Sequence, residues 1–349
     1  MQNQPYDNFW QRIHQSAKVK GFPVRVMFEL TYRCNFKCKH CYVPHEYQRS
    51  YGELKTKEIF AILEQLKEAG CFYLGFTGGE PFMRKDALDI FRYAKKCGFE
   101  IIIYSNGSLI DAKTARVLGE LRPNKVDITI PAMTKLAFEN ITGLAGSHAK
   151  VFKAIKLLRK NNVVLGFKSC VLKGNESEIV RIQKFAGSLG ALHRLDDMLS
   201  PALDGSKEPF RFRGILEGDE RMEPESVAEA PDICLPKAGR SRVAKELFRC
   251  GVGMSQAAIT PKGELKMCLM IDYPKYMIRD SSFKKSWEKM KGVVKKITPD
   301  DDYQCDKCSL EVYCKWCPGK SWLETRQFTA CDPESRRYAQ LMKNRMALK

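Results

Sequence analysis

Three cysteines near the start of the chain have the spacing of a metal-binding loop. Cys34, Cys38 and Cys41 are separated by three and then two residues, so one tight loop can turn all three sulfurs toward the same point. Thiolates are soft ligands that select iron–sulfur clusters or zinc, and both centres normally take four protein ligands. The next cysteine, Cys71, is far along the chain. Three ligands leave a coordination position open, so the spacing predicts a reactive iron centre; a zinc knuckle or chance grouping is the alternative.

A glycine-rich motif follows the next apolar segment. Its residues are Thr77, Gly78, Gly79, Glu80 and Pro81. The two glycines permit backbone conformations that other residues resist and let a ligand approach the chain closely. The carboxylate of Glu80 can face a cationic group. On its own the motif could also be a simple turn.

A second group of cysteines lies in the last third of the chain. Two CxxC pairs, Cys305/Cys308 and Cys314/Cys317, are only five residues apart, which is short for the two knuckles of a zinc ribbon. Iron–sulfur clusters are therefore favoured over zinc. In chain order the group is Cys250, Cys268, Cys305, Cys308, Cys314, Cys317 and Cys331.

Composition limits the class of protein. The chain has 349 residues, enough for two domains or a barrel with an appendage. The absence of a signal-like N-terminus and of a long apolar stretch predicts a cytoplasmic protein without a membrane span. In a reducing compartment the 14 cysteines indicate metal binding and not disulfides. The net charge of +18 could attract an acidic peptide, an electron donor or a polyanion.

Strand and helix patterns alternate through the first two thirds of the chain. Apolar segments predict strands at 24–30, 72–76, 101–104, 126–130, 163–171 and 191–195. Amphipathic segments between them predict helices, one with Thr56 as its N-cap and others at 86–97, 112–121, 147–160 and 177–189. Such alternation predicts parallel strands with crossover helices, and ligands at the carboxyl ends of the strands.

The fold class that follows is α/β, a partial (βα)6 TIM-like barrel followed by a cysteine-rich domain. We expect a lead-in at 1–23, the barrel at 24–204, a bridging segment at 205–245 and the cysteine-rich domain at 246–349. The bridging segment is polar and rich in Glu, Arg and Pro.

The first cysteine loop, with His40 before the last cysteine, resembles the CxxxCxΦC loop of radical S-adenosylmethionine (radical SAM) enzymes. That resemblance implies that Cys34, Cys38 and Cys41 hold a [4Fe–4S] cluster whose fourth iron binds S-adenosylmethionine (AdoMet). One strand later, Gly78, Gly79 and Glu80 match the GGE motif that holds the AdoMet amino group in this family.

Three further strand ends agree with this resemblance. Asn106 lies in a segment similar to the TNG turn after the third strand. Thr129 stands where a Ser usually contacts the AdoMet ribose, and Asn175 lies where many relatives carry Asn after the fifth strand. The chain departs from the family at Thr142, where relatives often have an Arg for the AdoMet carboxylate. The carboxylate contact is therefore unassigned.

The C-terminal cysteines resemble the SPASM domain, an auxiliary-cluster module of radical SAM enzymes. The resemblance implies one [4Fe–4S] cluster on Cys305, Cys308, Cys314 and Cys331. It implies a second on Cys250, Cys268 and Cys317, with Cys234 as a candidate fourth ligand or an iron left open. The spacing of two residues before Cys317 departs from the common three.

The resemblance implies an enzyme that reductively cleaves AdoMet to a 5′-deoxyadenosyl radical and abstracts a substrate hydrogen. The expected substrate is a ribosomally synthesised peptide, modified by crosslinking, epimerisation or excision. The expected partners are a separate peptide-recognition protein and a flavodoxin- or ferredoxin-type electron donor. Asp196 and Asp204 either line the substrate end of the barrel or cap turns.

Two alternatives stay open at this point. The first is a radical SAM enzyme for a small molecule or tetrapyrrole, or a sulfatase-type protein maturase. The second is a non-catalytic zinc or iron–sulfur protein that binds nucleic acid through its basic last third. The motif at Thr77–Pro81 argues against the second alternative, since a binding module does not need it.

Overall fold

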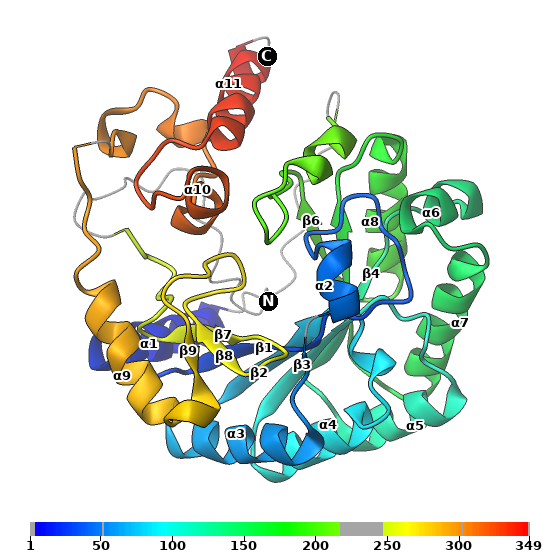
Figure 1. The fold of residues 1–349 in the computed structure, drawn as a ribbon. Helices are drawn as coiled ribbons and strands as arrows, with labels where there is room; N and C mark the ends of the chain where they lie inside the picture. Colours follow the sequence, from blue (N-terminus) through cyan, green and yellow to red (C-terminus); the bar gives the residue numbers. More distant parts are fainter. Residues whose placement is uncertain (1–3, 51, 217–246, 302, 348–349) are drawn as a thin grey trace.

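The computed structural model describes residues 4–50, 52–216, 247–301 and 303–347. Its central element is a curved nine-stranded sheet in the order β6-β5-β4-β3-β2-β1-β7-β8-β9 (Figure 1). The strands are β1 (Arg25–Thr31), β2 (Tyr73–Gly78), β3 (Glu100–Ser105), β4 (Lys125–Thr129), β5 (Leu165–Cys170), β6 (Leu192–Asp196), β7 (Gln256–Ile259), β8 (Glu264–Lys266) and β9 (Tyr276–Met277). Strands β1 to β6 are parallel neighbours in chain order, which confirms the predicted partial barrel.

Helices cover the convex side of this sheet. Figure 1 shows α3, α4, α5 and α7 along the outer rim. The helices are α1 (Gln4–Lys20), α2 (His45–Ser50), α3 (Thr56–Glu68), α4 (Ala87–Lys96), α5 (Ala112–Leu121), α6 (Lys135–Thr142), α7 (Ser147–Lys160), α8 (Ile179–Ser188), α9 (Phe283–Val294), α10 (Pro318–Thr325) and α11 (Pro333–Ala347). Among the described residues, no helix has both the length and the apolar character that crossing a membrane requires.

The predicted N-cap of α3 was wrong by one residue. Lys55 occupies the cap position, and its backbone N–H donates to the Glu58 carboxylate at 2.7 Å. The hydroxyl of Thr56 instead donates to Asp86 at 2.6 Å. Thr56 therefore joins the start of α3 to the start of α4.

Side chains along each strand alternate between an apolar, buried face of the sheet and a polar face. On β1, Val26, Phe28 and Leu30 are buried in the main core beneath the helices. A period of two places the residues between them on the concave face of the sheet, called the lumen below. Charged side chains lie there on several strands: Glu29, Lys125, Asp127, Lys168, Arg194 and Asp196. A barrel that only needed packing would not place so many charges inside.

The C-terminal region continues the barrel sheet. Strand β7 pairs in parallel with β1, with Phe28 opposite Ile259, and β8 and β9 extend the sheet in antiparallel pairs. Helix α9 packs beside α3, where the Phe283 backbone N–H donates to Gln65 at 2.7 Å. The domain boundary at 246 stays a prediction, but hydrogen bonding between strands crosses it.

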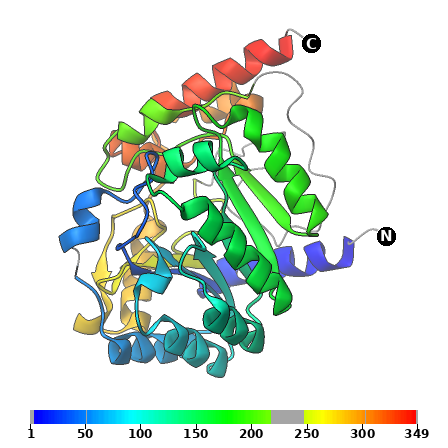
Figure 2. The ribbon, with the colours of Figure 1, turned by 90° about the vertical axis from the view of Figure 1, so that its right-hand side faces the viewer.

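Helices α10 and α11 pack at the end of the sheet where β5 and β6 finish. Figures 1 and 2 show both helices on that side, with α11 running across the molecule. The Tyr338 hydroxyl of α11 donates to Asp197 at 2.6 Å, and Lys315 forms an ion pair with the same carboxylate. Arg213 pairs with Glu334 at 2.7 Å. The C-terminal region thus contacts the carboxyl ends of the strands, where ligands are expected.

Because β7 belongs to the same sheet as β1, we predict that the barrel and the C-terminal region unfold together. Ile259→Ala removes a fully buried side chain and should lower the free energy of unfolding by about 3 kcal/mol. Urea unfolding should be followed by far-UV circular dichroism, which reports the barrel helices. Fluorescence reports mainly the C-terminal region, because Trp287, Trp316 and Trp322 lie there and only Trp10 lies outside it.

Both signals should shift together in the variant. Val164→Ala, at a side chain that is 59% exposed, is the control and should change stability by less than about 0.5 kcal/mol. A shift in fluorescence alone would contradict the prediction.

Candidate active site

The cysteine loop leaves the carboxyl end of β1 and is fixed by helix α6. Backbone N–H groups of Lys37 and Lys39 donate to the carbonyls of Thr142 and Ile141 at 2.8 and 3.2 Å. The carbonyls at the end of a helix have no intrahelical partner, so they are free to accept these bonds. Gly143 follows with φ of 65°, and a Cβ there would lie 2.8 Å from the Lys37 carbonyl oxygen. Helix α6 was not predicted from the sequence.

The structure brings the three thiols of this loop together. Burial raises the pKa of Cys34 to about 11, and nearby Glu80 and Cys41 raise it further. Burial also raises the pKa of Cys38 well above its usual value, with added contributions from Cys41, Cys34 and Cys170. Thiols that oppose one another's ionisation become thiolates together only when a cation compensates them. The donor set therefore fits an iron centre.

Asn106, at the end of β3, supports the first of these cysteines. Its side-chain amide N–H groups point to Cys34 Sγ at 3.7 Å and to Asn35 Oδ1 at 2.9 Å. Its Oδ1 accepts from the Ser108 hydroxyl at 2.7 Å. These bonds fix the orientation of the amide, which was predicted only as part of a cofactor-binding turn.

The glycine motif packs directly on the start of the cysteine loop. Gly79 N–H donates to the Thr31 carbonyl at 2.7 Å, and Glu80 N–H donates to the Arg33 carbonyl at 2.9 Å. A Cβ on Gly78 would lie 2.1 Å from the Thr31 oxygen, and one on Gly79 would lie 2.3 Å from the Arg33 oxygen. Both glycines are thus required by contact between two protein backbones.

Glu80 is fully buried and bonded to three donors. Its carboxylate accepts from Asn106 N–H at 2.7 Å, the Ser105 hydroxyl at 2.9 Å and Phe82 N–H at 3.1 Å. Burial raises its pKa to about 7, although these hydrogen bonds lower it. Glu80 therefore joins the end of β2 to the end of β3. Its predicted contact with the AdoMet amine stays a prediction.

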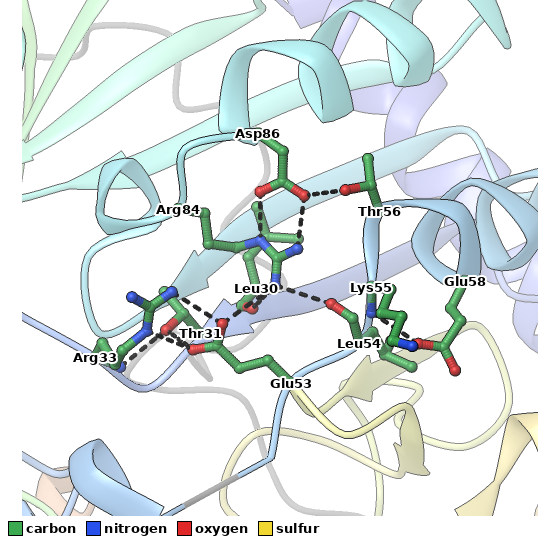
Figure 3. A network of polar contacts seen from close by, with 10 residues as sticks. All are labelled: Leu30, Thr31, Arg33, Glu53, Leu54, Lys55, Thr56, Glu58, Arg84 and Asp86. Atoms are coloured by element: carbon green, nitrogen blue, oxygen red, sulfur yellow. Dashed lines mark hydrogen bonds and ion pairs between the residues drawn. The ribbon is translucent and has the colours of Figure 1, made fainter.

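A buried arginine, Arg84, connects these segments and was not predicted from the sequence. Figure 3 shows Arg84 between two carboxylates: it pairs with Asp86 at 2.7 Å and with Glu53 at 3.3 Å. It also donates to the Leu54 carbonyl at 3.1 Å and lies 3.4 Å from that of Leu30. Arg33 forms two parallel hydrogen bonds with Glu53, at 2.9 and 3.0 Å. One network thus anchors the cysteine loop and the glycine motif.

The remaining predicted cofactor residues differ in their surroundings. Thr129 is partly exposed at the end of β4, next to Lys168 in register. Asn175 is fully buried and donates to the Pro131 and Cys170 carbonyls at 2.7 and 2.9 Å, so its contacts favour a supporting role. The buried Thr142 hydroxyl donates to the Phe138 carbonyl at 2.9 Å, and the AdoMet carboxylate contact stays unassigned.

Comparison with known proteins decides the family. Residues 28–186, which include the cysteine loop and the glycine motif, match the Radical SAM superfamily profile. The chain contains a radical SAM domain. Its similarity to known members extends over most of its length.

Two curated relatives and one solved structure illustrate this similarity. The AdoMet-dependent heme synthase of Methanosarcina barkeri is 23% identical over 333 residues, covering 89% of this chain and 95% of the relative. The antilisterial bacteriocin subtilosin biosynthesis protein AlbA of Bacillus subtilis is 26% identical over 314 residues, covering 84% and 67%. Streptococcus suis SuiB bound to its precursor peptide SuiA aligns with a TM-score of 0.66 at 14% identity, covering 96% and 82%.

As a radical SAM enzyme, the protein uses a [4Fe–4S] cluster and AdoMet. The open coordination position predicted from three cysteines is consistent with this pair of cofactors. In the described ranges, no group of three or more His, Cys, Asp and Glu side chains could hold a single metal ion. The fit to a cluster rests on the thiols of the loop.

Part of the C-terminal cysteine group converges on the start of α10. Cys317 is the N-cap of that helix, and Cys268 Sγ would lie 3.6 Å from a Cβ on Gly319. Burial raises the pKa of Cys268 to about 12, with a further contribution from Cys317. Helix N-termini favour thiolates, so this site also fits an anionic cluster.

The other C-terminal cysteines are less enclosed. Cys308 and Cys331 are exposed, and Cys250, Cys305 and Cys314 are partly buried. Cys234, the candidate fourth ligand, lies outside the described residues. Of the three described cysteines outside both groups, Cys71 is buried, whereas Cys97 and Cys170 are partly exposed.

The raised pKa of Glu80 predicts a pH-dependent stability. The folded protein holds this proton up to about pH 7, whereas the unfolded chain releases it near 4.5. The neutral carboxyl therefore contributes to the free energy of unfolding below pH 4.5, and this contribution is lost as the pH rises to about 7. Its size is at most on the order of 3 kcal/mol. Glu80→Gln cannot ionise and should lack this component.

Urea unfolding of the metal-free protein at pH 5 and pH 7.5, without oxygen, would measure it. The variant should be less stable at pH 5, because its amide N–H₂ must face one of the three donors. Its stability should then fall less steeply with pH than that of the parent protein. Equal pH slopes would show that Glu80 is already ionised at pH 5.

Proposed function

We propose that this enzyme modifies a ribosomally synthesised peptide by radical chemistry. The observation that carries the proposal is the likeness to SuiB, solved with its precursor peptide, over 96% of this chain. AlbA, named for the biosynthesis of a bacteriocin, supports the same substrate class. The polar lumen beneath α10 and α11 offers side chains that can bind a polar segment of peptide.

A second candidate substrate is a tetrapyrrole. The M. barkeri heme synthase has 95% of its length covered by this chain, so no large part of that relative is missing here. The polar lumen also suits a ligand with carboxylates. Substrate assays must therefore include a tetrapyrrole.

We assign the cofactor sites as follows. Cys34, Cys38 and Cys41 hold the [4Fe–4S] cluster, and the segment Gly78–Glu80 with Asn106 and Thr129 borders AdoMet. The chemistry that these bound groups supply is reductive cleavage of AdoMet and removal of a substrate hydrogen atom. The protein orients the substrate and excludes water. The C-terminal cysteines hold two auxiliary clusters that take an electron back or bind substrate.

The proposed enzyme works with two protein partners in the cytoplasm. A flavodoxin- or ferredoxin-type protein supplies the electron, and a separate protein presents the peptide. The cytoplasm is the proposed compartment, because fourteen cysteines used as thiols and clusters need reducing conditions. The segments 1–23, 24–204, 205–245 and 246–349 remain the proposed domains.

Three four-iron clusters predict about 12 iron and about 12 sulfide per chain after anaerobic reconstitution. Replacing Cys34, Cys38 and Cys41 together with Ala should remove about a third of the iron and leave the rest. Iron and acid-labile sulfide assays measure this directly. Stoichiometric zinc without sulfide, or iron content unaffected by the triple change, would rule out the assignment.

Peptides encoded beside the gene provide the test of substrate. With AdoMet and a strong reductant, the true substrate should give 5′-deoxyadenosine in proportion to modified peptide. Mass spectrometry then names the reaction: loss of two hydrogens for a crosslink, no change for epimerisation, a larger loss for excision. If 5′-deoxyadenosine rises only with a tetrapyrrole or another small molecule, the peptide proposal fails.

A further inference from the structure

Charged side chains of β5 and β6 meet at the C-terminal end of the lumen. Lys168 pairs with Asp196 at 3.0 Å, and Arg194 pairs with the same carboxylate at 3.4 Å. The side chains of Lys168 and Asp196 are still 32% and 25% exposed, so solvent reaches them. Although burial acts to raise it, the two cations hold the pKa of Asp196 well below its usual value.

A third cation approaches from the C-terminal region. Lys320 lies in the first turn of α10, three residues after Cys317, and it forms no hydrogen bond or ion pair with any described residue. It lies within electrostatic range of Cys317, Asp196 and Asp332, and burial lowers its pKa. The Asp332 carboxylate accepts from Ser335 N–H at 2.8 Å instead. An ammonium group with three donors and no acceptor is costly to remove from water.

These cations lie between the two cysteine groups. Cys38 of the first loop is within electrostatic range of Cys170, and Cys170 is within range of Lys168 and Asp196. The ion pair between Lys315 and Asp197 holds the segment that leads into α10 at the end of β6. Lys320, in the first turn of α10, is therefore within electrostatic range of both Asp196 and Cys317. A substrate that gives up a hydrogen atom near the first cysteine group and an electron to the C-terminal group must bind in this region between them.

We propose that Lys168 and Lys320 bind a carboxylate group of the substrate in this part of the lumen. The inference rests on the proposed function and narrows it to substrates with a carboxylate beside the reacting position. Lys168 has one acceptor in Asp196 and two donors to spare, and Lys320 has all three. Asp196 keeps Lys168 and Arg194 in place without neutralising both. A carboxylate offers two oxygens, enough to join the two ammonium groups.

The test uses the full-length, reconstituted protein saturated with AdoMet. Two capped tripeptides serve as probes in calorimetric titrations: acetyl-Ala-Glu-Ala-amide and its neutral Gln counterpart. The Glu peptide should bind about tenfold more tightly, because the neutral Gln amide cannot form charge-assisted hydrogen bonds with both ammonium groups. Lys320→Gln and Lys168→Gln should abolish the preference, and Lys320→Arg should retain most of it.

Lys284→Gln is the matched control, because Lys284 is exposed on α9 and should leave the preference unchanged. AdoMet affinity should stay within twofold in Lys320→Gln. The inference is wrong if the parent protein binds both peptides equally or neither, or if Lys320→Gln keeps the preference. It is also wrong if Lys320→Gln weakens AdoMet instead, because the carboxylate would then be that of the cofactor.

The experiments distinguish failure of the carboxylate site from failure of the proposed peptide substrate. If a neighbouring peptide is modified while the Glu and Gln probes bind alike, only the carboxylate inference fails. If the Glu preference is found but only a tetrapyrrole is turned over, the carboxylate site stands and the peptide substrate fails.

Discussion

The contact between two backbone segments is the constraint on which the site depends. The turn after β2 lies against the strand end that begins the cysteine loop, so closely that neither Gly78 nor Gly79 can carry a side chain. Two backbone hydrogen bonds hold the turn there. The buried Arg84 side chain forms ion pairs with Glu53 and Asp86 that hold the same segments. Because backbone contacts allow little adjustment, the cysteine loop has one position relative to the sheet.

Around this contact, several residues that the family motifs predict to contact AdoMet form hydrogen bonds with other protein groups. Glu80 and Asn175 direct their hydrogen bonds to neighbouring strand ends, and Asn106 supports Cys34. Each of these residues fixes a loop at the carboxyl end of a strand. A residue that contacts a cofactor would be of the same type. The sequence alone therefore does not distinguish a cofactor contact from a structural role. Preorganised loops of this kind suit a reactive centre that must exclude water.

The sequence predicted the barrel well where the elements are long and periodic. Helices α5 and α7 have the predicted bounds, since amphipathic spacing and clear ends define them. Helix α6 was missed because eight residues give too few turns for a pattern. Strands β7 to β9 are two to four residues long, and their pairing with distant strands leaves no local signal.

At the site, the cysteine loop and glycine motif were found because spacing and glycine carry chemical meaning in the sequence. Arg84, Lys168 and Lys320 were missed because a buried or enclosed cation looks like any surface cation until the fold is known. Only the fold brings Cys170 near Cys38.

The pairing of β7 with β1 has a consequence for how the chain can be divided. Without residues 256–259, β1 would become the edge of a parallel sheet, with unpaired N–H and C=O groups beside the apolar side chains of Val26 and Phe28. Such an edge is a template for pairing with another chain. The barrel therefore has no protected boundary of its own, and a fragment that ends before β7 exposes an aggregation-prone strand at the start of the cysteine loop.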